Sequence, residues 1–182
     1  MTADDPISMK VIRARPGHEL LLANYFAVNE THFQRWNPIL PPEHHSIAAW
    51  KQRLLDREQE FRNRYSAHFI GVDATESFII GSCSLSGIIQ GAFKAGFMGY
   101  SVAQRYEGQG YMHRIVSHVI DYAFNDMKLH RIMANHMPVN ARSEALLKKL
   151  GFEKEGYAKD YLYINGQWED HVLNSLINPA EV

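Results

Sequence analysis

Apolar and polar residues repeat along this chain with two different periods, and the changes of period separate the expected strands from the expected helices. Residues 7–14 alternate in the manner of a β-strand. After the turn-forming segment 15–17, apolar residues recur every three or four positions, which predicts an amphipathic helix. Its buried face is expected to contain Leu20, Leu21, Tyr25 and Val28.

A second helix is expected after an irregular, aromatic stretch at residues 31–42. Ser46 is of the residue type preferred at a helix N-cap, because its hydroxyl accepts a hydrogen bond from an amide of the first turn. The buried face of this helix is expected to contain Ile47, Trp50, Leu54 and Phe61. The chain therefore inserts two helices between its first strand and the rest of its sheet.

Three apolar stretches follow the second helix, and polar or glycine-containing breaks separate them. The stretches cover residues 66–72, 78–89 and 92–102, with breaks at residues 73–76 and at Gly91. Short strands divided in this way are typical of an antiparallel meander. We expect three consecutive antiparallel strands.

The clearest helical pattern of the chain begins after Gly108-Gln109-Gly110. Its expected buried positions are Met112, Ile115, Val116, Val119, Ile120, Ala123 and Met127. A strand at residues 131–137 then leads to another helix, which Asn140 caps and Gly151 ends.

Two final strands, at residues 155–164 and 167–176, are joined by Asn165-Gly166, a pair that favours a tight hairpin turn. The full order is one strand, two helices, three strands, a helix, a strand, a helix and two strands. This order predicts an α+β fold with a central twisted sheet of about seven strands, mixed but mostly antiparallel, flanked by helices.

The composition indicates a folded globular chain. Its 182 residues fit a single domain spanning residues 1–182, and 46% are hydrophobic, 12% aromatic and 21% charged. The formal net charge of −1 argues against wholesale wrapping of nucleic acid, and we expect no direct DNA binding. Cys83 is the single cysteine, so no disulfide framework is expected.

The N-terminal segment argues against a secreted or membrane protein, and the spacing of the histidines argues against a metalloprotein. Residues 1–16 contain no apolar run of the signal-peptide kind, which predicts a cytoplasmic protein without membrane contact. The ten histidines include the adjacent pair His44 and His45, and His113 and His118 five positions apart. These spacings match no metal motif, and we expect no metal site.

An anion site is expected where the strand at residues 98–102 runs through the Gly108-Gln109-Gly110 loop into a helix. The unpaired amides and the positive end of the helix dipole meet there, and glycines allow an anion to approach the backbone. A Gly-x-Gly alone is equally compatible with an ordinary tight turn. The absence of a following Gly-Lys-Ser/Thr and of a third glycine disfavours P-loop and Rossmann sites.

The second signal is Asn140-Ala141-Arg142-Ser143, which opens the helix that ends at Gly151. By itself Asn140 needs no explanation beyond its role as an N-cap. Together the two motifs resemble the GNAT acetyltransferases, in which a strand, a pyrophosphate loop and a helix precede a strand and an Asn-x-x-Ala/Ser helix. The resemblance implies the GNAT fold.

Three longer stretches, residues 130–135, 151–162 and 165–171, are similar to the branch of this family that acetylates the N-terminal alanine of ribosomal proteins. The similarity extends back through Trp36 and Trp50. It implies transfer of the acetyl group of acetyl-CoA, as cosubstrate, to a protein N-terminal α-amine. The implied partner is a small-subunit ribosomal protein, with association with the ribosome as a further property.

The resemblance also implies which residues hold the cofactor. The main chain of Tyr100, Ser101 and Val102 would hold the pantetheine arm and the acetyl carbonyl, with Asn140 and Ser143 lining the arm. The pyrophosphate would bind the amides of Gly108, Gln109, Gly110, Tyr111, Met112 and His113. Two registers of the loop compete: one starts at Arg105, and the other, which we prefer, starts at Glu107 because the helical period begins at Met112.

The usual acid and base of the family are both absent. Leu147 occupies the place of the common catalytic tyrosine, which leaves Ser143 as the proposed acid, although a serine in a first helical turn also has a purely structural explanation. Phe97 replaces the common carboxylate, so Glu107 is the first candidate base and Asp160 the second. A water relay is also compatible, since an N-terminal amine has a pKa of about 8.

Other functions stay open at this point. The same fold and cofactor motif serve acetyltransferases that act on a small amine or an antibiotic. A binding module for ribosome assembly that retains a CoA site is a non-enzymatic alternative. Trp36, in the irregular loop, could line a peptide groove with Phe33, Trp50 and Tyr65, although aromatic residues at helical spacing more often form core.

Overall fold

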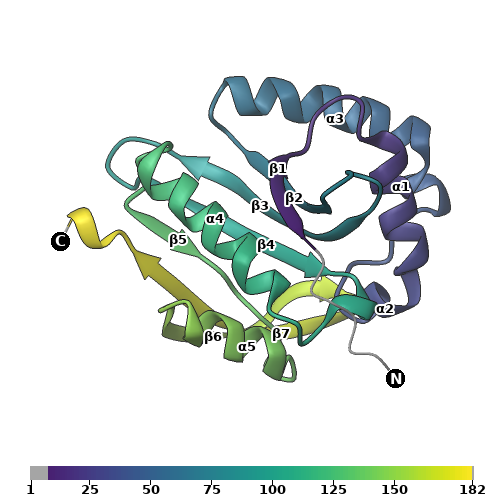
Figure 1. The fold of residues 1–182 in the computed structure, drawn as a ribbon. Helices are drawn as coiled ribbons and strands as arrows, with labels where there is room; N and C mark the ends of the chain where they lie inside the picture. The colour runs from purple at the N-terminus through teal and green to yellow at the C-terminus, as the bar shows by residue number, and fades with distance from the viewer. Residues whose placement is uncertain (1–7, 182) are drawn as a thin grey trace.

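The computed structural model describes residues 8–181, which form one seven-stranded sheet with helices packed on it (Figure 1). The strands are β1 (Met9–Arg13), β2 (Ala67–Asp73), β3 (Ile79–Ile89), β4 (Ala95–Val102), β5 (Arg131–Met133), β6 (Glu153–Ile164) and β7 (Gln167–Ile177). The α-helices are α1 (Glu19–Val28), α2 (Glu30–Gln34), α3 (Ile47–Arg62), α4 (Tyr111–Asn125) and α5 (Ala141–Lys149). Short 3-10 helices are η1 (Pro42–His45), η2 (Gln104–Tyr106) and η3 (Pro179–Glu181).

The sheet runs in the order β1-β2-β3-β4-β5-β7-β6. Every neighbouring pair is antiparallel except β4 and β5, which are parallel. The predicted mixed, mostly antiparallel sheet of seven strands is therefore confirmed, as is the order of elements apart from the additional short helix α2. Of the expected first strand, Ile7 lies outside the described residues.

The predicted face of α1 is wrong in part. Leu20 and Val28 are 57% and 82% exposed, whereas Leu22, Ala23 and Tyr25 are buried. Apolar residues surround this helix on all sides, so their spacing does not select one face. In α3, similarly, Ile47 is exposed while Trp50 and Leu54 are buried.

Two other element boundaries differ from the sequence-based expectation. The stretch expected to be irregular contains the short helix α2, and β5 ends at Met133 instead of residue 137. After β5 the chain no longer runs beside β4 and instead follows β7. The Ala134 amide donates to the Asn174 carbonyl there, and His136 forms an isolated bridge with Val172. The caps are as expected, since Ser46 accepts a hydrogen bond from the Ala49 amide.

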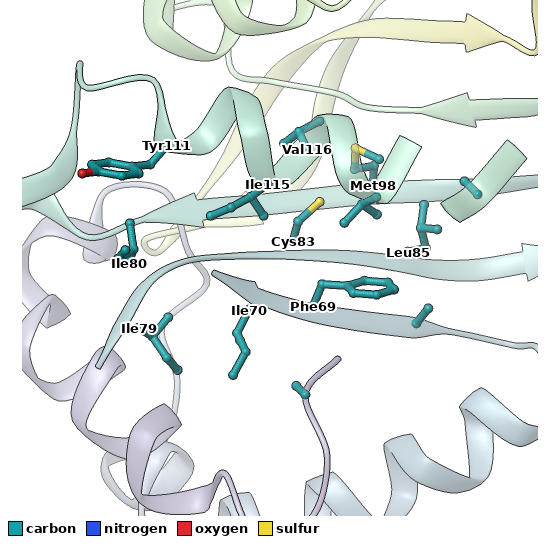
Figure 2. Close-up of a cluster of buried hydrophobic side chains, with 14 of the residues drawn as sticks. Phe69, Ile70, Ile79, Ile80, Cys83, Leu85, Met98, Tyr111, Ile115 and Val116 are labelled. Atoms are coloured by element: carbon teal, nitrogen blue, oxygen red, sulfur yellow. The ribbon is translucent and has the colours of Figure 1, made fainter. Parts of the chain in front are cut away.

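α4 covers one face of the sheet, and the space between them is filled. Ile115 and Val116 of α4 point towards Cys83 and Met98 on the strands (Figure 2), and all four side chains are buried. Gly71 of β2 makes room for Ile115, because a Cβ at that glycine would lie 2.5 Å from Ile115 Cδ1. These residues belong to one hydrophobic core cluster, which also includes Leu22, Trp50 and Leu54 on the other face of the sheet.

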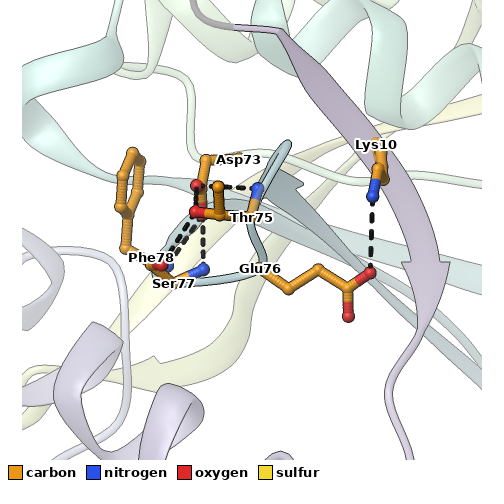
Figure 3. Close-up of polar contacts among 6 residues, drawn as sticks. All are labelled: Lys10, Asp73, Thr75, Glu76, Ser77 and Phe78. Carbon is orange, nitrogen blue, oxygen red and sulfur yellow. Dashed lines mark hydrogen bonds and ion pairs between the residues drawn. The ribbon is translucent and has the colours of Figure 1, made fainter.

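The turn between β2 and β3 is held by one carboxylate. Asp73 accepts hydrogen bonds from the amides of Thr75 (3.1 Å), Ser77 (2.6 Å) and Phe78 (3.0 Å) and from the Thr75 hydroxyl (Figure 3). Burial by itself would raise the pKa of Asp73, but these hydrogen bonds lower it to about 2. Phe78 stacks on Tyr106, at 5.9 Å between ring centroids, and so supports η2 just before α4.

The hairpin of β6 and β7 has the predicted turn, with positive φ at both Asn165 (46°) and Gly166 (87°). Its tip contacts the loop before α3, where the Asn165 amide donates to the Asn37 carbonyl at 3.0 Å. A Cβ at Gly166 would lie 3.3 Å from Ile39 Cδ1. Segments far apart in the sequence are thus joined at the edge of the molecule.

Candidate active site

β4 and β5 separate in the middle of the sheet. They pair only through Ala95–Phe97 with Arg131–Met133, after which β4 continues to Val102 without β5 beside it. The side of β4 that faces β5 therefore has backbone groups available to a ligand beyond Phe97. Tyr100, Ser101 and Val102, the residues expected to hold the pantetheine arm, lie in this part of the strand.

The glycine loop after β4 has the backbone geometry of an anion site. Gly108 and Gly110 have φ of 71° and 82°, and space is open where their Cβ atoms would be. Gly110 is the N-cap of α4, and the Arg114 amide donates to its carbonyl at 3.3 Å. The amides of Gly110, Tyr111, Met112 and His113 precede that bond, as at any helix start, and are oriented towards the loop.

α5 brings Ser143 to the same strand. Asn140 caps the helix by accepting from the Ser143 amide at 3.1 Å, and the Ser143 side chain, 8% exposed, reaches β4. Its Oγ lies 2.5 Å from the hydroxyl of Tyr100. Leu147, which replaces the usual tyrosine, is buried one turn later.

The side chain of Tyr100 is a functional candidate that the sequence reasoning missed. That reasoning assigned Tyr100 only a main-chain role, yet burial raises the pKa of its hydroxyl to about 12 and keeps it protonated near neutral pH. The alternation of β4 carried a signal, since Tyr100 falls on the same side as buried Met98, which faces α4. Tyr100 and Ser143 thus form a pair of hydroxyls at the contact between β4 and α5.

Glu107 does not stand free at the mouth of the loop. Its carboxylate forms ion pairs with Arg142 of α5 and with His32 of α2, the latter at 3.4 Å. Because these contacts already occupy the carboxylate oxygens, this geometry does not favour the predicted base role. The second candidate base, Asp160, lies on β6, where its amide donates to the Asp170 carboxylate at 2.9 Å.

A cavity of about 270 Å³ lies on the face of the sheet opposite α4 and reaches β4. Its lining comes from α1, α3, the loop before α3 and the first strands, and includes Leu22, Phe26, Asn37, Trp50, Arg57, His68, Ser82, Ser84, Gly99, Tyr100 and Ser101. The Ser101 hydroxyl is hydrogen-bonded to Tyr25 (2.9 Å) and Ser82 (3.0 Å). The cavity and the Tyr100 hydroxyl thus approach the same segment of β4 from opposite faces.

The alternative aromatic groove of Trp36, Phe33, Trp50 and Tyr65 is not formed as a unit. Phe33 and Trp50 are buried and Tyr65 is exposed, while Trp36 is stacked by the Arg35 guanidinium at 4.7 Å and does not line the cavity. Trp50 alone contributes to the cavity wall.

Residues 8–181 contain neither a metal-binding cluster nor a membrane-spanning helix. No three His, Cys, Asp or Glu side chains in this part of the chain gather in a way that could hold a metal ion. A membrane crossing needs a long apolar helix, and the described residues contain none.

The fold and the sequence both match known acetyltransferases. The acetyltransferase (GNAT) domain family matches residues 12–153. The chain is 44% identical over 159 residues to the ribosomal protein uS5-alanine N-acetyltransferase of Escherichia coli (strain K12), covering 87% of this chain and 81% of that protein.

Two solved structures have the same architecture. The ribosomal-protein-S5-alanine acetyltransferase from Vibrio fischeri superposes with a TM-score of 0.92 at 40% identity, covering 98% of each chain. Mycobacterium smegmatis RimJ in complex with CoA-disulfide has a TM-score of 0.87 at 24% identity, covering 96% of this chain and 83% of that chain, and indicates the shared fold.

Proposed function

This chain belongs to the GNAT family of acetyl-CoA-dependent N-acetyltransferases, and we propose that its acceptor is the N-terminal α-amine of an alanine-starting, small-subunit ribosomal protein. The observation that carries the proposal is the 44% identity to the E. coli uS5-alanine N-acetyltransferase over 87% of the chain. The protein then acts on a partner that belongs to the ribosome. No particular feature of the described residues favours a small amine, an antibiotic or a purely structural role.

We place acetyl-CoA between β4 and β5, with its pyrophosphate at the start of α4. The separation of the two strands after Phe97 supports this position, as do the glycines at 108 and 110. The backbone of Tyr100, Ser101 and Val102 would orient the thioester carbonyl. Amide groups fixed in this way stabilise the negative charge that develops on the carbonyl oxygen as the amine attacks, a large contribution to acyl transfer.

The hydroxyl pair of Ser143 and Tyr100 would supply the proton. As the amine nitrogen bonds to the acetyl carbon, the carbon–sulfur bond breaks, the nitrogen releases one proton to water and the thiolate of CoA takes up one proton. Ser143 can donate it, and Tyr100, 2.5 Å away and protonated at neutral pH, can replace it. The amine itself needs little help, because an N-terminal amine has a pKa of about 8 and a fraction is neutral at pH 7.

The experiment compares two acceptor peptides across a range of pH. One starts with a free alanine amine; the other has the same sequence with a blocked N-terminus and one lysine. We expect the first to be acetylated at a rate that levels off near pH 8 and the second far more slowly, since a lysine amine has a pKa of about 10.4. Equal or faster acetylation of the blocked peptide would overturn the α-amine assignment.

Gly110→Val serves as the cofactor control in that experiment. A β-branched residue at φ of 82° is strained and places a side chain over the loop amides. The variant should lose the rise in melting temperature that acetyl-CoA gives to the wild type. An unchanged rise would show that the pyrophosphate does not bind at this loop.

A further inference from the structure

Arg57 of α3 lines the cavity and has no counter-ion there. Its guanidinium is partly buried and lies 5.2 Å from the ring of Trp50, and within residues 8–181 it makes no hydrogen bond or ion pair. Burial, followed by the charge of Arg53, lowers its pKa to about 10, so it stays charged at neutral pH. A cation that is partly removed from water and has no carboxylate in hydrogen-bond contact is disfavoured in a folded protein.

The rest of the cavity wall offers Arg57 no anion. The lining contains hydroxyls, the Asn37 amide and His68, but neither aspartate nor glutamate. Burial, and then the charge of Arg57, lowers the pKa of His68 to about 3, so His68 is neutral. The charge of Glu60, one turn along α3, acts in the opposite direction and raises the pKa of Arg57. Its carboxylate, however, accepts a hydrogen bond from the Ser66 hydroxyl at 2.6 Å and lies outside the cavity wall.

We propose that Arg57 is the carboxylate-binding residue of the acceptor site. The acceptor would carry an aspartate or glutamate among its first few residues, and the guanidinium would bind that side chain while the α-amine reaches β4. This inference rests on the proposed function, since it assigns the acceptor chain to the cavity that ends at Ser101. It names the acceptor as an acidic N-terminal segment.

The geometry of the cavity supports this assignment. Arg57 and the β4 residues Gly99 to Ser101 line one space of about 270 Å³, which is too small for more than the first few residues of a peptide. Arginine binds carboxylates through two parallel hydrogen bonds, and the stacking of Arg57 over Trp50 limits the orientations of its planar group. The hydroxyls of Ser82 and Ser84 add polar oxygens that can accept hydrogen bonds beside the path.

The chain provides a matched control for Arg57. Arg53 lies one turn earlier on α3 and also stacks over Trp50, at 4.2 Å, but it donates to the His44 carbonyl at 2.8 Å and does not line the cavity. Removal of either arginine takes one stacked cation from Trp50. Only the removal of Arg57 should change the selection of an acidic acceptor.

The experiment measures kcat/KM for alanine-starting peptides that carry glutamate or glutamine at the second, third or fourth position. In the wild type, glutamate at the best position should be preferred about 10- to 100-fold, the range expected of a charge-assisted hydrogen bond. Arg57→Met should reduce this ratio to near one, whereas Arg53→Met should keep it. Arg57→Lys, which retains the charge without the planar fork, should keep a reduced preference.

Each contrary result has a clear meaning. Equal rates on glutamate and glutamine peptides in the wild type, or an unchanged ratio in Arg57→Met, would overturn the carboxylate site and leave α-amine acetylation intact. A wild type that acetylates none of these peptides would overturn the proposed function, and the carboxylate site with it. If Arg57→Met does not fold, the wild-type ratio and that of Arg57→Lys decide the question.

Discussion

The two faces of the central strands differ in what they hold. On the face covered by α4, the side chains of Phe69, Cys83 and Met98 pack against Ile115 and Val116 and fill the space. On the face covered by α1 and α3, the alternate positions of the same strands line a cavity, and apart from Ile70 the residues there are small or polar. These are His68, Ser82, Ser84, Gly99 and Ser101.

The contrast shows how the two-residue period of a strand divides two tasks. Each strand gives one set of side chains to a packed core and the other to a space that admits a ligand. A substitution under α4 that does not touch Tyr100 should therefore change the free energy of unfolding and leave the chemistry alone. A substitution beside the reaction centre should do the opposite.

The largest effect is expected on the packed face, from Ile115→Ala. Removing a fully buried isoleucine leaves a cavity under α4 and should lower the free energy of unfolding by about 2–5 kcal/mol. Turnover measured well below the melting temperature should stay within about twofold of the wild type. Urea unfolding and steady-state kinetics on the same preparation would check both values.

Ser84→Ala on the opposite face is the control for that variant. The Ser84 hydroxyl makes one long hydrogen bond, to the Gly99 carbonyl at 3.4 Å, so its loss should cost less than about 1 kcal/mol. A stability loss as large as that of Ile115→Ala would contradict the proposal that the α4 face provides stability and the opposite face lines a ligand site.

The next effect concerns the hydroxyl pair. Ser143→Ala should lower turnover by roughly tenfold to several-hundredfold, the scale of one lost acid or one transition-state hydrogen bond, with nearly unchanged binding of acetyl-CoA. Tyr100→Phe should reduce turnover as well if the two hydroxyls act as one proton path. The double variant should then be no slower than the slower single variant.

Wild-type turnover in Ser143→Ala would assign that serine to helix geometry alone. An additive double variant would show that the two hydroxyls act separately, and would remove Tyr100 from the proton path. Thermal shifts with acetyl-CoA would confirm that each variant is folded and binds the cofactor.

The smallest effect is expected at Glu107. Its carboxylate links α2 to α5 through ion pairs with His32 and Arg142. Glu107→Gln should lower turnover only a few-fold, because its carboxylate serves mainly to hold these helices. Arg142→Gln breaks one of the same ion pairs and should have a similar effect. A loss of a hundredfold or more in Glu107→Gln alone, measured as a pH–rate profile, would restore the base role.

Local patterns were enough to predict most of the fold. The caps at Ser46 and Asn140 and the Asn165-Gly166 turn depend on neighbouring residues alone, and each is found as predicted. The side of α1 that is buried depends instead on how α1 meets α3 and β3. Because apolar residues are spread evenly around α1, its sequence pattern does not indicate which side makes that contact.

The site divides in the same way. The loop at residues 108–110 and the cap at Asn140 were found from motifs, because short sequences specify backbone geometry. The contact of Tyr100 with Ser143 joins residues 43 positions apart, and the acceptor cavity joins α1, α3 and β4. Such contacts follow from tertiary packing, which spacing along one chain does not reveal.

The hydrogen bond between Asn165 and Asn37 has a consequence for protein engineering. Asn37 lines the acceptor cavity, and the hairpin tip that holds its carbonyl lies almost 130 positions later in the chain. The acceptor specificity of a relative could be transferred by exchanging the loop at residues 37–40. Residues 165–166 then have to be exchanged together with that loop. The two segments form one cassette, although no stretch of sequence contains both.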